Sequence, residues 1–284
     1  ITIDGYHEAE KLTIAREHLL PRQIHRAGLE PDELEISDDI LTEVVERWTR
    51  EAGVRGLERR LGTLSRKAAT KIAAGEDAPI VIESADLRPM LGPARKDREE
   101  LMGRTSVPGV ATGLAVTGSG GDVLFVEAGT MDGEPGLTLT GQLGDVMQES
   151  AKIALSWVRS NADELGIDSA DLQKRFHIHF PAGAIPKDGP SAGVTVTTAL
   201  VGLLTGRTMR SEVAMTGEIS LQGLVLPIGG VKQKVLAAHR AGLTEVIVPS
   251  ANADDLEDVP EAVRESMTFH TPSNLSEVLE TALA

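Results

Sequence analysis

The spacing of apolar side chains differs between the beginning of the chain and the rest. Up to about residue 91, apolar positions recur every three or four residues, the period of helices that bury one face. The spacing predicts helices at 7–19, 38–52, 55–74 and 85–91, and one short strand at 80–82. Ser37 and Ser84 occupy expected N-cap positions, and Gly53 is where the second helix is expected to stop. This part is therefore expected to be a small helical bundle.

From about residue 107 the pattern becomes one of short apolar strands, several of them separated by glycine-rich turns. The expected strands cover 111–116, 122–128, 137–140, 175–180, 212–216, 221–226 and 244–248. The expected helices cover 145–165, 194–204, 231–241 and 274–283. Because strands and helices mix without a strict alternation, the pattern predicts a mixed α/β (α+β) fold for this part.

Between the two patterns lies a charged segment, 92–105, with few large apolar residues. Such a composition is typical of a linker between domains. A chain of 284 residues also exceeds one typical domain. We therefore expect a helical domain at 1–91, a linker at 92–105 and a mixed α/β domain at 106–284.

Composition narrows the classes of function. The formal net charge of −15 argues against a general nucleic-acid or membrane surface, so neither partner is expected. The absence of cysteine excludes disulfides, thiolate metal ligands and cysteine nucleophiles. No apolar run is long enough to span a membrane and no signal peptide opens the chain, so a cytoplasmic protein is expected. Since the chain begins at Ile1, inside a helical pattern, we expect it to be part of a longer protein.

Candidate chemistry begins at Ser191. A turn-forming segment, Pro186-Lys-Asp-Gly-Pro, leads through Ser191-Ala-Gly into an apolar run that is long enough to be a buried helix. The first N–H groups of such a helix have no intrahelical partner, so they can stabilise an oxyanion formed when the Ser191 hydroxyl attacks a carbonyl. The alternative is that Ser191 is only an N-cap, the usual role of a serine at this place.

Lys234 is the candidate base. Val231, Val235 and Ala238 define the apolar face of the helix expected at 231–241, and Lys234 lies on the shoulder of that face, whereas Lys232 points away. Burial lowers the pKa of a lysine, so Lys234 could accept a proton from a serine. Thr216, at the end of an expected strand, could hold the amine in place. The alternative is that Lys234 extends its amine into water.

Two other chemistries are compatible with parts of the sequence. His177 and His179 point to one side of their strand and could form a metal pair, but no third ligand accompanies them, so packing or hydrogen bonding near the Ser191 loop is the better interpretation. Gly189-Pro-Ser191-Ala-Gly also matches a Gly-x-Ser-x-Gly hydrolase motif, with His239 or His270 as base. That motif needs a strand running directly into the serine, whereas the loop at 181–190 contains three prolines.

Three motifs in this order resemble the proteolytic domain of Lon proteases. They are Pro186-Lys-Asp-Gly-Pro-Ser191-Ala-Gly193, Met215-Thr-Gly-Glu-Ile219 and Leu226-Pro-Ile-Gly-Gly-Val-Lys-Gln-Lys234. The resemblance implies that Ser191 is the nucleophile and Lys234 the base, with Thr216, Asp188, His177 and His179 around them. N–H groups near Ser191 and the turn at Asp188 and Gly189 would stabilise the oxyanion. Gly144-Asp-Val-Met-Gln-Glu-Ser150 resembles another stretch of that domain, with Asp145 where a glutamate is expected.

The first part resembles the small helical subdomain of the Lon AAA+ ATPase module. The motifs are Gly5-Tyr6, His18-Leu-Leu-Pro21 and Arg50-Glu-Ala-Gly-Val-Arg-Gly-Leu-Glu-Arg59. The resemblance places Arg55 near nucleotide phosphate and Tyr6 near adenine, whereas the alternatives are an ion pair of Arg55 with Glu51 or Glu58 and a packing role for Tyr6. No P-loop motif occurs, so ATP and Mg²⁺ are expected as cofactors only of the full-length protein.

The resemblance therefore implies the serine endopeptidase portion of an ATP-dependent protease with a Ser–Lys dyad. It also implies a homohexameric ring that degrades unfolded or damaged proteins, while this chain without ATP would cleave only peptides or unfolded chains. A non-catalytic domain of the same family, kept for assembly or regulation, is the competing class; the intact Ser191 and Lys234 argue against it.

Overall fold

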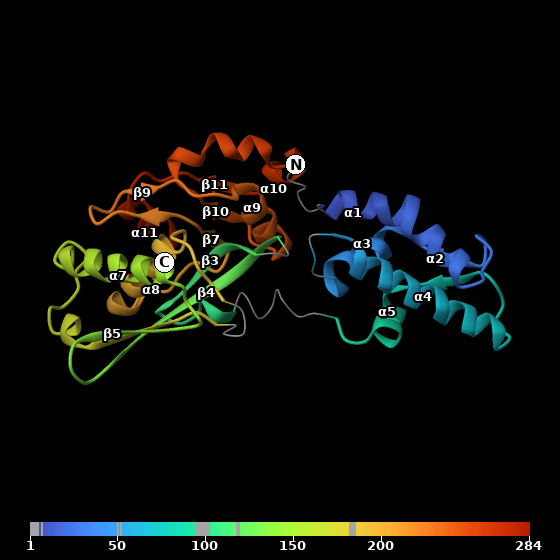
Figure 1. The fold of residues 1–284 in the computed structure, drawn as a ribbon, viewed down its shortest axis with the longest axis horizontal. Helices are drawn as coiled ribbons and strands as arrows, with labels where there is room; N and C mark the ends of the chain where they lie inside the picture. The colour runs from blue at the N-terminus through green and yellow to red at the C-terminus, as the bar shows by residue number, and fades with distance from the viewer. Residues whose placement is uncertain are drawn as a thin grey trace. The chain divides into compact units, whose positions relative to one another are not determined.

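The computed structural model describes residues 6, 8–49, 51, 53–94, 103–117, 120–181 and 186–284. They form two compact units, one on each side of residues 95–102 in the sequence, and each unit has its own core. In Figure 1 the helical unit is blue to teal and the mixed unit is green to red. The predicted class, a helical unit followed by a mixed α/β unit, is confirmed. Within the described residues, no helix is long and apolar enough to cross a membrane.

The helical unit is built from helices that bury one face and from one small pair of strands (Figure 1). The elements are α1 (Glu8–Ile14), a π-helical turn η1 (Ala15–Leu19), α2 (Leu20–Arg26), β1 (Leu34–Ile36), α3 (Asp38–Trp48), α4 (Arg55–Ala73), β2 (Ile80–Ile82) and α5 (Ser84–Leu91). Ser37 caps α3 as predicted, since its side chain accepts the N–H of Ile40. The first helical stretch extends to Arg26, beyond the predicted end at residue 19.

Three details of the helical unit differ from the prediction. Strand β1 was not predicted; it pairs in parallel with β2. Helix α3 ends at Trp48 and not at Gly53, because Thr49 turns to an extended conformation and its hydroxyl donates to the Val45 carbonyl of the last turn. Helix α5 is capped by Glu83 and not by Ser84. The Glu83 carboxylate accepts the backbone N–H of Asp86, and the Asp86 carboxylate accepts the backbone N–H of Glu83.

The mixed unit is organised around a seven-stranded sheet in the order β11-β10-β7-β3-β4-β6-β5. The strands of this sheet are β3 (Val110–Thr117), β4 (Gly120–Met131), β5 (Gly136–Thr140), β6 (Arg175–His179), β7 (Val213–Met215), β10 (Glu245–Ile247) and β11 (Thr268–His270). Strand β4 runs antiparallel to β6, whereas β10 is parallel to both β7 and β11. The sheet therefore contains both parallel and antiparallel pairs.

Helices cover both faces of this sheet, in the arrangement drawn in Figure 1. The helices are α7 (Asp145–Ser160), α8 (Gly193–Thr205), α9 (Val231–Arg240), α10 (Glu261–Ser266) and α11 (Leu275–Ala282). Met215 of β7 packs in the core with α7, α8 and α11, whereas its neighbour Ala214 packs in the core with α9. Because neighbouring strand residues point to opposite faces, α8 and α9 lie on opposite sides of β7. The candidate nucleophile and base thus approach each other from opposite faces at the end of that strand.

Several elements of the mixed unit differ from the prediction. Helix α7 ends at Ser160 and not at residue 165, and the side-chain amide of Asn161 donates to the Trp157 carbonyl at this end. The strand expected at 221–226 is a hairpin of β8 (Glu218–Ile219) and β9 (Val225–Leu226) joined by a turn. The segment predicted as the linker, 92–105, falls largely on residues outside those described.

Candidate active site

Ser191 immediately precedes the N-cap of α8. The N-cap is Ala192, which offers no side-chain cap, so the interpretation of Ser191 as a simple N-cap is wrong. The carbonyl of Ser191 accepts hydrogen bonds from the N–H of Gly217 (2.9 Å) and from the hydroxyl of Thr216 (3.4 Å). The segment that follows β7 therefore fixes the backbone of Ser191.

Two glycines allow α8 to approach this segment closely. A Cβ on Gly193 would lie 2.8 Å from Cγ1 of Ile219, and a Cβ on Gly217 would lie 2.9 Å from Cγ1 of Val194. The N–H of Val194 also donates to the carbonyl of Gly217 (3.2 Å). Larger residues at these two positions would push the start of α8 away from the end of β7, and Ser191 with it.

Lys234 is buried, with a relative exposure of 3%. Helix α9 carries it into the protein because Val231, Val235 and Ala238 pack on the sheet, as the helical spacing predicted. Its Nζ donates a hydrogen bond to Oγ1 of Thr216 (3.0 Å), and burial lowers the pKa of Lys234 from 10.5 to about 8. The alternative, in which its amine extends into water, is therefore wrong, whereas the contact with Thr216 was predicted.

Thr216 links the amine to the nucleophile segment. Its N–H donates to the carbonyl of Ile247 (3.0 Å), so the sheet fixes its backbone, and its hydroxyl lies between Lys234 Nζ and the Ser191 carbonyl. Among the described residues, Oγ of Ser191 has no hydrogen-bond partner. The two candidate reactive groups are thus connected through Thr216, and the serine oxygen is unengaged.

Asp188 connects the Ser191 loop to the start of α7. The N-cap of α7 is Gly144, which has no side chain, and Oδ1 of Asp188 takes its place by accepting the N–H of Met147 (3.0 Å). The same oxygen accepts the N–H of Gly189 (2.9 Å). In this structure the Gly189 N–H is therefore occupied, and the N–H groups of Ser191 and Ala192 are the ones without an acceptor among the described residues.

The residue before Asp188 strengthens this connection. The N–H of Lys187 donates to the Gln142 carbonyl (3.0 Å), and the Lys187 carbonyl accepts the N–H of Gly144 (2.8 Å). Its Nζ donates to the carbonyl of Gly141 (3.2 Å), and burial lowers the pKa of Lys187. Gln142 adopts a positive φ of 56°, which is uncommon for a residue with a side chain and is found at functional sites. Sequence reasoning attached no role to Lys187 or Gln142.

His177 and His179 share one face of β6, as predicted, and both bond to the same hydroxyl. Oγ1 of Thr140 lies 2.9 Å from Nε2 of His177 and 2.7 Å from Nδ1 of His179. No group of three possible metal-ligating side chains occurs among the described residues. The pair therefore ties β6 to the end of β5, next to the turn at Gly141 and Gln142 that holds the Ser191 loop.

In the helical unit, Arg55 is the exposed first residue of α4, and Tyr6 is also exposed. The carboxylate of Glu51 accepts the N–H groups of Gly56 and Leu57, both at 2.8 Å, which caps α4. That of Glu58 pairs with other arginines. Neither carboxylate therefore forms the ion pair with Arg55 that the sequence left open as an alternative.

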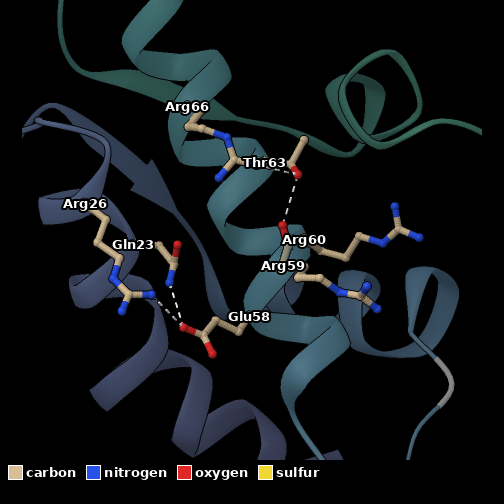
Figure 2. A pocket seen from close by; sticks show the side chains of 7 residues that line it. All are labelled: Gln23, Arg26, Glu58, Arg59, Arg60, Thr63 and Arg66. Atoms are coloured by element: carbon tan, nitrogen blue, oxygen red, sulfur yellow. Dashed lines mark hydrogen bonds and ion pairs between the residues drawn. The ribbon is translucent and has the colours of Figure 1, made fainter.

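Between α2 and α4 lies a shallow polar hollow of about 460 Å³, shown in Figure 2. Oε1 of Glu58 lies 2.8 Å from Arg22 and 3.2 Å from Arg26, and it accepts the side-chain amide of Gln23 (2.9 Å). Four arginines line the hollow, namely Arg26, Arg59, Arg60 and Arg66. In Figure 2, Arg59 and Arg60 point away from the Glu58 cluster. The arginines therefore do not converge on one point.

Comparison with known proteins covers both units. Residues 25–80 match the family model of the Lon protease AAA+ ATPase lid domain, and residues 81–284 match that of the Lon protease (S16) C-terminal proteolytic domain. The border at 80–81 differs from the border of the compact units, because β2 pairs with β1 and α5 packs in the helical core.

Three relatives illustrate the similarity. Lon protease of Salinispora arenicola is 59% identical over the whole chain, and that of Mycolicibacterium smegmatis is 54% identical, also over the whole chain. Lon protease homolog 2, peroxisomal, of Danio rerio is 47% identical over 99% of the chain. The chain covers 36%, 36% and 38% of these relatives, so it spans little more than a third of their length. With both units matched, the chain belongs to the Lon protease family and carries the lid of its ATPase module together with its proteolytic domain.

Proposed function

We propose that this chain is the peptide-cleaving part of a Lon-type protease and acts as a serine endopeptidase with a Ser191–Lys234 dyad. The observation that carries the proposal is the buried amine of Lys234, hydrogen-bonded to a threonine that also bonds the carbonyl of Ser191. A lysine shielded from water beside a serine at the start of a helix has the arrangement that a general base requires.

The lowered pKa supplies the neutral amine that the reaction needs. With a pKa of about 8, about a quarter of the Lys234 side chains are neutral at pH 7.5, whereas about one in a thousand would be neutral at the ordinary value. Neutral Lys234 takes the hydroxyl proton of Ser191 as Oγ bonds to the scissile carbonyl carbon. The protonated lysine then gives this proton to the leaving amine as the C–N bond breaks. Water attacks the acyl-enzyme in the same way and restores Ser191.

The developing oxyanion requires donors at the nucleophile. The N–H groups of Ser191 and Ala192 are at the start of α8 and have no acceptor among the described residues. The start of a helix also places positive potential at this point. Removing one such donor typically raises the barrier by ~3 kcal/mol. Thr216 orients Lys234, and Asp188 holds the loop through its bond to α7.

The remaining expectations concern the longer protein. We propose that it is a cytoplasmic homohexamer that binds ATP and Mg²⁺ and degrades unfolded or damaged proteins, with Arg55 and Tyr6 near the nucleotide. This chain contains no P-loop sequence, so its own reaction is the ATP-independent cleavage of peptides and unfolded chains. A nucleic-acid or membrane partner is not part of this proposal, given the net charge of −15.

A fluorogenic-peptide assay tests the dyad against its alternatives. Activity should be lost in Ser191→Ala and in Lys234→Ala but kept in His239→Ala. His239 lies five residues after Lys234 on α9 and so points to a different side of that helix, and the other candidate base, His270, is bonded to Glu245 (2.8 Å). Absence of activity in every form would favour a non-catalytic assembly domain. Activity that survives Lys234→Ala and disappears with His239→Ala would favour a histidine-based hydrolase.

A further inference from the structure

Ser150 lies on α7 and contacts the residue immediately before the nucleophile. Its Oγ donates a hydrogen bond to the carbonyl of Pro190 (3.3 Å), and the side chain is buried, with a relative exposure of 5%. The N–H of Gly193 donates to the same carbonyl (3.2 Å). The peptide group between Pro190 and Ser191 is therefore held on its oxygen side by two donors, one from α7 and one from α8.

The direction of this carbonyl determines the direction of the Ser191 N–H. The Pro190–Ser191 bond is trans, and in a trans peptide the C=O and N–H point to opposite sides. Because the carbonyl faces Ser150, the N–H of Ser191 faces away from α7. That N–H has no acceptor among the described residues, so it is available to a negative oxygen.

We propose that Ser150 is a positioning residue for the oxyanion: by holding the Pro190 carbonyl, it aims the Ser191 N–H at the oxygen that becomes negative in the transition state. The inference rests on the proposed function of Ser191 as nucleophile. Ser150 itself does not touch the substrate. It acts through one peptide group, the one between Pro190 and Ser191.

Helix α7 is a fixed support for this task. Its first turn is bound to the same loop through the Asp188 carboxylate and Met147 N–H, and through the Lys187 carbonyl and Gly144 N–H. A Cβ on Gly144 would lie 2.3 Å from Cγ of Asp188, so the two segments are in close contact. Since α7 and the Ser191 loop are joined by several hydrogen bonds, the position of the Ser150 hydroxyl relative to the Pro190 carbonyl is fixed.

The test compares Ser150→Ala with Ser156→Ala in peptide-cleavage assays. Ser156 is a matched control because it is on the same helix, is exposed, and bonds only the Lys152 carbonyl (2.8 Å). For Ser150→Ala we expect kcat to fall about tenfold to a hundredfold while KM stays within about twofold, since the aim of one oxyanion donor is lost. Affinity for a peptide boronate, whose tetrahedral adduct places an oxygen at the same site, should fall in parallel with kcat.

Two further readouts separate this role from a general structural one. The pH midpoint of kcat should stay where it is in the wild type, because Lys234 and Thr216 are unchanged. Ser150→Cys fills the site with a slightly larger side chain that donates only weakly, so its kcat should lie between those of the wild type and Ser150→Ala. If Ser150→Ala does not fold, the lower kcat of a folded Ser150→Cys variant is the deciding measurement.

Several outcomes would overturn the inference. They are an unchanged kcat in Ser150→Ala, a shifted pH midpoint, or a loss of kcat without any loss of boronate affinity. A failure of the underlying function looks different, because either Ser191→Ala would then retain activity or the wild type itself would be inactive, whatever Ser150 does. If Ser191→Ala is inactive and Ser150→Ala equals the wild type, only the present inference falls.

Discussion

The arginine cluster around Glu58 in the helical unit and Lys234 in the mixed unit place positive charge in opposite environments. In the helical unit, Arg22 and Arg26 pair with Glu58 while their side chains remain 49% and 62% exposed. In the mixed unit, Lys234 is 3% exposed and its hydrogen-bond partner is the neutral Thr216. An arginine in water stays protonated and takes part in ion pairs, whereas a lysine removed from water and from carboxylates can release its proton. Burial without a counter-charge, more than charge itself, therefore distinguishes Lys234 from the arginines around Glu58.

The largest effect on peptide cleavage should come from replacing Lys234 by arginine, the residue type that forms the exposed ion pairs of the helical unit. Lys234→Arg keeps a positive charge of similar length but cannot be deprotonated, so peptide cleavage should fall about a thousandfold or more, as in Ser191→Ala. The measurement is kcat/KM for a fluorogenic peptide. Lys232→Arg, two residues earlier on α9 and only half-buried, is the matched control and should cleave normally. Substantial activity in Lys234→Arg would refute the role of the amine as base.

Thr216→Val should have the next largest effect. Valine keeps the shape of threonine but removes the oxygen that accepts from Lys234, so kcat should fall about tenfold to a hundredfold. The apparent pKa in the rate profile should also fall, because a hydrogen bond that favours the charged amine is lost. Thr198→Val is a suitable control: Thr198 is equally buried, but its hydroxyl bonds within α8 and to Met215. A pKa that rises in Thr216→Val would contradict this assignment.

The burial that distinguishes Lys234 from the exposed arginines could be predicted in part from the sequence. The helical period of α9 placed Lys234 on the shoulder of the apolar face formed by Val231, Val235 and Ala238, which is why its burial could be predicted from local spacing. The cap of α7 could not be predicted in this way, since Asp188 and Met147 are 41 residues apart and meet only once the Ser191 loop pairs with the turn before α7. Ser150 belongs to a motif that resembles the family, but its proposed role could not be predicted, because it also depends on the contact between α7 and the Ser191 loop.

Short elements were missed for a related reason. Strand β1 (Leu-Glu-Ile) has a glutamate between its two apolar residues, whereas the predicted strand β2 (Ile-Val-Ile) is a continuous apolar run, and β8 has only two residues, too few to establish a period of two. The cap of α5 was assigned to Ser84 because serine is the commoner cap, whereas Glu83 takes that place through its exchange with Asp86. The periodicity of apolar residues thus predicts long helices well. It does not predict a cap or a short strand whose position depends on one contact with another residue.

The pH dependence of cleavage follows from the lowered pKa of Lys234, about 8. The neutral amine is the active form, so kcat should rise with pH through this value and level off above it. Between pH 7 and pH 9 the neutral fraction increases about tenfold. The measurement is kcat for a peptide without titrating groups in this range. A rate that falls as the pH rises from 7 to 9 would contradict a lysine base. His239→Ala should leave the profile unchanged.

The smallest effect should come from the charge cluster of the helical unit. Glu58→Gln keeps an oxygen for Gln23 but removes the partner of Arg22 and Arg26. Each of these pairs is about half exposed, and exposed ion pairs contribute ~0–1 kcal/mol each, so the helical unit should lose about 1–2 kcal/mol at most. This loss should shrink in ~1 M salt, where surface charges are screened.

The melting of the helical unit and the cleavage of a small peptide should be measured on the same Glu58→Gln variant. Glu43→Gln is the control, because Glu43 pairs with a single arginine, Arg47, within α3. Peptide cleavage should equal that of the wild type, since the mixed unit has its own core and holds Ser191, Thr216 and Lys234. A marked change in cleavage would mean that exposed charge in one unit governs the buried amine in the other. The contrast between a charge kept in water and an amine removed from it would then no longer explain where the chemistry occurs.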